Sequence, residues 1–131
     1  MKTINKYIIE KLKIGKTTKQ QYTCHPKDRD ELYEILKERL AKDKNANLND
    51  IDVSEIEDMS FLFDNLDPHD IDISQWDVSK VKDMLHMFAY CPNFNCDLSN
   101  WDVSNVEDMW AMFEGCHSLT NIPSWYKEQM I

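Results

Sequence analysis

The sequence predicts an α/β solenoid, in which parallel short strands and short helices recur with a 25-residue period behind an N-terminal helical cap. Three observations predict it. A twelve-residue stretch that begins at Asp52 recurs at Asp77 and at Asp102. An amphipathic helical pattern precedes the first copy, and two glycines and four prolines leave few flexible joints. A fixed period of this size is typical of stacked units that bury their apolar faces against one another.

The chain of 131 residues is long enough for one domain or one short array with a cap. We expect an N-terminal helical region and cap over residues 1–45 and a repeat solenoid over residues 46–131. The solenoid would hold three repeats, a partial fourth and a C-terminal cap. In the partial repeat, Trp125 takes the place that Trp76 and Trp101 hold in the preceding units.

Two helices are predicted before the repeats. Ile4, Ile8 and Leu12 recur at i, i+4 and i+8, which predicts a basic helix over residues 2–14. The second helix covers residues 28–40, with Asp28 as its N-cap and an apolar stripe of Leu32, Ile35, Leu36 and Leu40. We expect it to cover the open end of the stack, because the first repeat would otherwise expose its core to water.

Each repeat is predicted to contain a very short strand followed by a short helix. The strand is expected around residues 73–74 of the second copy. Ser54, Ser79 and Ser104 stand where helix N-caps belong. After the cap, apolar residues recur at i, i+3, i+6 and i+7, which predicts one apolar helix face, and in the second copy these are Val81, Met84, Met87 and Phe88.

The charge of the chain is strongly acidic and unevenly placed. The net charge is −9, and residues 51–131 hold 3 Lys or Arg against 16 Asp or Glu. Such a surface repels nucleic acid and acidic lipid, so we expect neither direct nucleic-acid binding nor membrane binding. It suits a protein partner with a basic surface. The chain shows no apolar run near the ~20 residues that span a bilayer and no secretory signal at its start, so we expect a cytoplasmic protein.

Aspartates recur at three positions of the repeat and should form columns of like charge about 5 Å apart. The columns are Asp52, Asp77 and Asp102, then Asp58, Asp83 and Asp108, then Asp72 and Asp97. Their repulsion needs compensation. Backbone N–H groups at turns and helix starts would supply it, and calcium between neighbouring carboxylates is the alternative. A surface that mimics nucleic acid is a third possibility.

No pattern in the sequence indicates catalysis. The four cysteines form no C-x-x-C pair, and Cys91 and Cys116 share one repeat position, where oxidation could join them. No nucleophile motif and no glycine-rich phosphate loop is present. We therefore expect no enzyme activity, no catalytic residue, no cofactor and no metal ligand.

Candidate partner-binding residues follow by subtraction, because positions that differ among the copies are not needed to hold the stack together. Five such residues are the candidates: Phe61, Leu85, His86, Tyr90 and Trp110. Aromatic residues among them suit an interface, where exposed rings commonly act as anchors. The alternative is that they pack locally or against a cap.

The repeats themselves resemble a known family. Residues 76–91 and 101–116 both read W-D-V-S-x-V-x-D-M-x-x-M-F-x-x-C. This motif is similar to that of the BspA-like leucine-rich-repeat family, which consists of bacterial repeats of about this length, many from surface proteins. The resemblance covers residues 46–125. It implies a leucine-rich-repeat-like solenoid and a role in binding other proteins, and it implies no catalytic residues.

The first functional hypothesis is therefore a non-catalytic protein–protein interaction module that uses non-repeating side chains. The alternative is an acidic inhibitor, of a phage or mobile-element anti-defence type, that mimics nucleic acid to block a DNA- or RNA-binding protein. A calcium-stabilised exported adhesin fragment is the third. The direction of the carboxylates distinguishes the first two, because mimicry needs an exposed stripe and fails if turns engage them.

Overall fold

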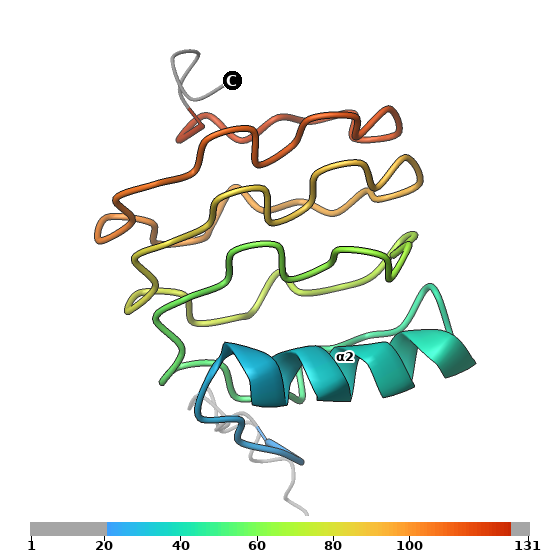
Figure 1. The fold of residues 1–131 in the computed structure, drawn as a ribbon, viewed down its shortest axis with the longest axis vertical. Helices are drawn as coiled ribbons and strands as arrows, with labels where there is room; N and C mark the ends of the chain where they lie inside the picture. The colour runs from blue at the N-terminus through green and yellow to red at the C-terminus, as the bar shows by residue number, and fades with distance from the viewer. Residues whose placement is uncertain (1–20, 127–131) are drawn as a thin grey trace, which may run out of the picture.

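The computed structural model describes residues 21–126. The helix predicted over residues 2–14 and residues 127–131 of the predicted C-terminal cap lie outside this range. One α-helix, α2 (Arg29–Lys42), forms within it. The chain then winds through layers that lie one above the other, with α2 at one end of the stack (Figure 1). The domain boundary predicted after residue 45 stays a prediction.

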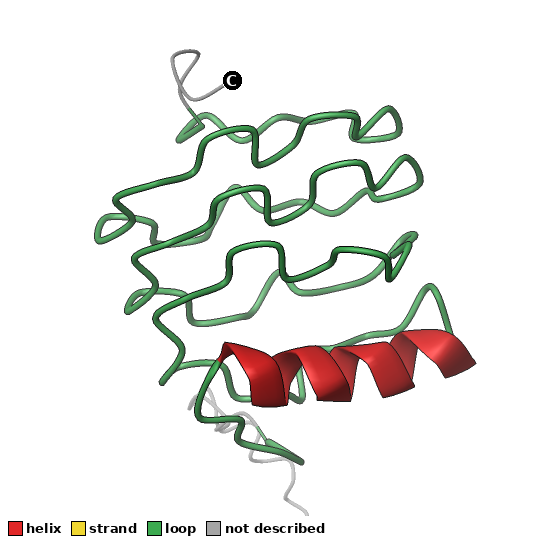
Figure 2. Ribbon diagram, in the orientation of Figure 1, coloured by secondary structure: helices red, strands yellow, loops and turns green. Residues whose placement is uncertain are grey.

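The predicted α/β solenoid is wrong. Apart from α2, residues 21–126 form only turns, bends and irregular backbone (Figure 2). Within residues 21–126, β-type pairing is limited to four isolated parallel bridges, which are Cys24↔Ile51, Asn47↔Asp72, Asp58↔Asp83 and Asp83↔Asp108. The strand predicted around residues 73–74 is absent, since Asp72 forms a single bridge and Ser74 already lies in a turn. The short helix predicted in every repeat is also absent.

Left-handed backbone explains why the repeat helices do not form. Phe61, His86 and Ala111 share one repeat position and have φ of 55°, 53° and 53°. A second position is left-handed as well, at Tyr90 (φ 59°) and Gly115 (φ 76°) among others. A right-handed helix cannot continue through such residues. The chain instead makes successive tight turns, in which the N–H groups of Leu62, Asp64 and Leu66 bond to the carbonyls of Met59, Phe61 and Phe63.

The serines predicted as helix N-caps do not cap helices. Each one instead donates hydrogen bonds to an aspartate two residues earlier, within a turn. Ser79 donates both its N–H and its hydroxyl to Asp77 Oδ1, at 3.0 and 2.6 Å. Ser54 and Ser104 bond in the same way to Asp52 and Asp102. An aspartate that accepts from the backbone two residues later forms a local turn, which competes with helix formation.

Backbone hydrogen bonds join successive repeats at a regular spacing. We call residues 52–66, 77–91 and 102–116 the first, second and third turn segments. Met59 N–H donates to the Asp83 carbonyl at 2.8 Å, and Met84 N–H to the Asp108 carbonyl at 2.7 Å. In both pairs the acceptor lies 24 positions after the donor. Phe61, Phe63, His86, Phe88 and Tyr90 donate forward with the same spacing.

The predicted cap helix is confirmed as α2. It begins after Asp28, whose side chain accepts from Glu31 N–H at 2.9 Å. Leu32, Leu36 and Leu40 are buried. On the side of the first turn segment, Arg29 donates to the Ser60 carbonyl. α2 thus supplies a donor where an earlier repeat would have supplied one. No helix among residues 21–126 is long and apolar enough to cross a membrane.

Two columns of parallel rings fill the core. Trp76, Trp101 and Trp125 stack with centroids 6.4 Å apart, and Phe63, Phe88 and Phe113 stack at 5.0 and 5.6 Å. Each indole also donates to a carbonyl of the preceding repeat, as Trp101 Nε1 does to Ile73 at 3.0 Å. The tryptophan position is therefore fixed by a hydrogen bond as well as by packing, because a buried indole N–H needs an acceptor.

We predict that Trp101→Phe lowers the free energy of unfolding by about 0.5–1.5 kcal/mol, because the hydrogen bond from the indole to the Ile73 carbonyl is lost while the Trp76 N–H still donates to that carbonyl. Denaturant unfolding followed by circular dichroism measures the loss. Trp110→Phe is the matched control, since Trp110 is 52% exposed and surface changes stay within about 0.5 kcal/mol. Equal losses for the two variants would show that the indole hydrogen bond contributes nothing.

A second prediction concerns acid. The Ser74 hydroxyl, then Asn49 and the Ser74 N–H, lower the pKa of Asp72 by hydrogen bonding to its carboxylate. A lowered pKa in the folded state means that the stabilisation is present above the ordinary carboxyl pKa and is lost as pH falls through the folded value. Asp72→Asn keeps an acceptor but does not ionise. Unfolding curves at pH 7 and pH 3 should therefore differ less for this variant than for the wild type, and an unchanged difference would contradict the assignment.

Candidate binding surface

The five predicted partner-binding residues all reach the surface to some degree. Tyr90 is 68% exposed, Trp110 52% and Phe61 42%, whereas Leu85 and His86 are half-buried. Most large apolar side chains between residues 21 and 126 lie in the core. The exposed rings therefore stand out as candidates for contact with another molecule.

Three of the five residues form a third column of rings, which we call the exposed ring column: Phe61, His86 and Trp110. Phe61 stacks on His86 with centroids 5.0 Å apart, and Trp110 tilts against His86 at 5.3 Å. Each turn segment contributes one ring. The third segment has Ala111 at the repeat position of Phe61 and His86, and the neighbouring Trp110 supplies its ring instead.

The other two predicted residues lie apart from this column. Leu85 uses its N–H to close a turn with Asp83 Oδ1 at 2.9 Å. Among the described residues, Tyr90 makes no ring contact with the column. It lies at a cavity of about 430 Å³ whose lining includes Asp64, Asp67 and Asn93. Its ring rests above Gly115, where an added Cβ would come within 2.9 Å of it.

Aspartates hold the turns that carry the column. The Oδ1 atoms of Asp58, Asp83 and Asp108 accept the N–H groups of Ser60, Leu85 and Trp110 at 2.8, 2.9 and 3.0 Å. Asp52, Asp72, Asp77, Asp97 and Asp102 make equivalent bonds. The sequence left open what compensates the repulsion within the aspartate columns, and the structure shows that backbone N–H groups of the turns bond to these carboxylates. Among residues 21–126, no three His, Cys, Asp or Glu side chains group as metal ligands would.

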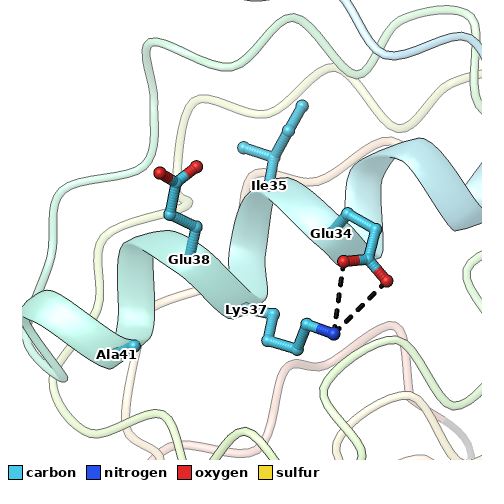
Figure 3. Close-up of a pocket in the computed structure, with 5 residues that line it drawn as sticks. All are labelled: Glu34, Ile35, Lys37, Glu38 and Ala41. Carbon is cyan, nitrogen blue, oxygen red and sulfur yellow. Dashed lines mark hydrogen bonds and ion pairs between the residues drawn. The ribbon is translucent and has the colours of Figure 1, made fainter.

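Sequence reasoning missed two further surface features. A shallow cavity of about 480 Å³ lies on the outer face of α2, between Ile35, Ala41 and three charged side chains (Figure 3). There Lys37 pairs with Glu34 at 3.2 Å within the helix. A smaller cavity, about 140 Å³, lies between Phe113, Ile122 and Tyr126. Ile122 is 52% exposed. Its position as a lone apolar residue before Pro123 was the one feature of the sequence that could have indicated this exposure.

The cysteine position of the repeat is occupied by protonated, free thiols. Burial, with a smaller contribution from the neighbouring Cys116, raises the pKa of Cys91 to about 12. Burial also raises the pKa of Cys116 to about 11. The Cys116 thiol donates to the Phe88 carbonyl at 3.0 Å. Both thiols are free, and they pack as small core residues rather than as nucleophiles, which require a lowered pKa.

We predict that Cys91 and Cys116 resist alkylation by iodoacetamide at pH 8 in the folded protein, because the thiolate is the reactive form. In urea both should react at the rate of an ordinary thiol. Mass spectrometry of peptides after timed quenching would separate the four cysteines. Rapid labelling of Cys91 in the native state would contradict its burial and its raised pKa.

Comparison with known proteins identifies the family of the chain. No curated protein and no solved structure matches the chain. The model of a family described as "Mycoplasma protein of unknown function, DUF285" matches residues 31–131. The match begins inside α2 and takes in all three turn segments and the exposed ring column. It covers most of the sequence, and the chain therefore belongs to the DUF285 family.

Proposed function

We propose that the protein is a non-catalytic protein–protein interaction module that holds its partner at the exposed ring column. One observation carries this proposal. Residues 21–126 build three columns of aromatic side chains, bury two of them, and leave Phe61 and Trp110 of the third about half exposed. Exposed rings in one cluster are typical anchors of protein interfaces.

The column is also well ordered for binding. Phe61 N–H donates to the Leu85 carbonyl at 2.9 Å, and His86 N–H donates to the Trp110 carbonyl at 3.1 Å. The backbone beneath the rings is therefore fixed before a partner arrives. A preorganised surface loses less conformational entropy on binding, which leaves more of the contact energy for affinity.

The resemblance to BspA-like repeats supports the same proposal. Within it, the chain would be a bacterial relative of those repeats that keeps their binding role without the strands and helices of a leucine-rich repeat. We propose a partner with a basic surface, because residues 51–131 are strongly acidic and opposite charge speeds association. A cytoplasmic location stays a prediction.

The turn hydrogen bonds weigh against a nucleic-acid mimic. Mimicry requires carboxylates arranged as a free stripe, whereas the repeating aspartates use Oδ1 to close turns two residues later. Their placement thus has a structural cause inside the chain. The ring column, in contrast, has no such internal role beyond its mutual stacking, and we therefore favour the interaction module.

The test compares binding by the wild type and by Phe61→Ser/Trp110→Ser. Partners captured from a bacterial extract would be identified by mass spectrometry and their affinities measured with purified protein. Removing two anchors should weaken binding at least 100-fold, since a hot-spot side chain contributes about 2 kcal/mol or more. Ile122→Ser is the matched control, because Ile122 is as exposed as Trp110 but lies outside the column.

Salt provides the second measurement. An interface anchored by aromatic rings should keep most of its affinity at high ionic strength, where interactions between exposed charges are screened. Binding that the double variant retains in full would refute the ring column as the anchor. Wild-type binding that collapses with salt would favour the acidic mimic instead. Unfolding curves of each variant confirm that the fold is intact.

A further inference from the structure

The cavity beside Tyr90 is a second place where the surface can hold another molecule. Its volume is about 430 Å³, which lies within the roughly 300–1,000 Å³ of ligand-binding cavities. No residue of the exposed ring column lines it. Phe63 and Cys91 contribute buried side chains to its lining, whereas Tyr90 is 68% exposed. The cavity therefore opens to solvent and is accessible to a partner.

Packing does not explain the conformation of Tyr90. Its φ is 59°, and the equivalent residues of the first and third turn segments are Asn65 (φ 64°) and Gly115 (φ 76°). Asparagine and glycine tolerate left-handed backbone, whereas a bulky side chain there is strained. The Tyr90 ring lies against Gly115 and adds little to the core, because most of it is exposed. Strain of this kind is typical of residues that hold ligands.

Two carboxylates, those of Asp64 and Asp67, line the cavity. Asp67 Oδ1 accepts from Asn93 Nδ2 at 3.1 Å, and Asp67 Oδ2 lies 3.2 Å from His69 Nε2. The hydrogen bond from Asn93 lowers the pKa of Asp67, with smaller contributions from His69 and Lys44. Asp67 is therefore ionised at neutral pH. Asp64 is exposed, and the lining contains no Lys, Arg or His.

The two carboxylates act on the same buried wall of the cavity. Burial is the largest cause of the raised pKa of Cys91, and Asp67 and Asp64 both contribute to the rise through their negative charge. Lys44 approaches the same region, but its Nζ donates to the Leu66 carbonyl at 2.8 Å and it is not part of the lining. The cavity therefore attracts a cation and repels an anion.

A guanidinium group fits this combination of one ring and two carboxylates. It is planar, stacks on aromatic faces and donates two parallel hydrogen bonds to a carboxylate. The chain uses the same combination elsewhere, since the Arg29 guanidinium lies 5.4 Å from the Tyr33 ring centroid and its Nη1 lies 3.3 Å from Asp30 Oδ1. A metal ion fits less well, because no three His, Cys, Asp or Glu side chains between residues 21 and 126 group as its ligands would.

We propose that the cavity binds an arginine side chain of a partner protein, with its guanidinium against the Tyr90 ring and the carboxylates of Asp64 and Asp67. A polypeptide is the better source of this group, because free arginine carries an α-carboxylate that the two aspartates repel. The strong negative charge of residues 51–131 speeds the approach of such a basic partner. The cavity is separate from the exposed ring column, and the proposal stands whether or not that column binds.

The experiment titrates the capped tripeptide acetyl-Gly-Arg-Gly-amide into the full-length ¹⁵N-labelled protein. We expect saturable shifts at the amides of Tyr90 and Asn93, with little change at Phe61 and Trp110 of the exposed ring column. The matched ligand control is the same tripeptide with citrulline, which keeps the shape of arginine but carries no charge. It should bind at least tenfold more weakly, because it loses the charge-assisted hydrogen bonds to the carboxylates.

Two variants separate the carboxylate from the ring. Asp67→Asn should weaken tripeptide binding about tenfold, and asparagine tolerates the left-handed backbone of Asp67 (φ 49°). Tyr90→Asn, which introduces the residue found at the equivalent position 65, should weaken binding about threefold. Asp70→Asn is the matched control and should change binding less than twofold, because Asp70 is exposed and does not line the cavity. Unfolding curves verify the fold of each variant.

Five outcomes would overturn the proposal. The first is an absence of saturable shifts at Tyr90 and Asn93 at millimolar tripeptide. The second is equal binding of the citrulline tripeptide. The third is equal binding of a lysine tripeptide, or the same shifts with calcium chloride, which would mark a site for any cation. The fourth is tighter binding of free arginine than of the tripeptide. The fifth is an equal loss for Asp67→Asn and Asp70→Asn. Saturable shifts that need both the guanidinium and Asp67 would support it.

Discussion

The structure depends on backbone hydrogen bonds that join each repeat to the next. Met59, Met84 and their neighbours donate forward to the residue 24 positions later, as in the pair 59 and 83. Bonds in the opposite direction lie just before them, where Lys82 donates to the Glu57 carbonyl and Glu107 donates to the Lys82 carbonyl. At the end of the stack next to α2, the side chains of Arg29, Tyr33 and Lys44 donate to carbonyls of the first turn segment.

The same hydrogen bonds set the spacing of the side chains. Residues one period apart are held at stacking distance, so any aromatic repeat position becomes a column of rings. Phe63, Phe88 and Phe113 form such a column inside the core, at 5.0 and 5.6 Å. Phe61, His86 and Trp110 form one at the surface. The candidate site therefore results from the same spacing that builds the core, and it differs from the buried columns in that its rings are exposed.

The repeat period and α2 were predictable from the sequence, because both leave patterns that depend on spacing alone. The local conformation was not. Phe61 and His86 have left-handed backbone, which is unusual for residues with large side chains, and apolar spacing does not reveal the sign of φ. One signal was available in D-x-S, as in Asp77 to Ser79, since this pattern also forms aspartate turns. The sequence indicated Phe61, His86 and Trp110 as candidates but not that they form one column, because Trp110 lies one residue before the repeat position of His86.

The central claim is the forward hydrogen bonding between repeats, and scalar couplings through hydrogen bonds measure it most directly. In uniformly ¹³C,¹⁵N-labelled protein, the amide nitrogens of Met84, His86 and Phe88 should couple to the carbonyl carbons of Asp108, Trp110 and Met112. Such couplings require a real donor and acceptor pair. Their presence would establish the layers and their direction. Couplings from each amide to the carbonyl four residues earlier would instead reveal helices in the repeats and contradict the account.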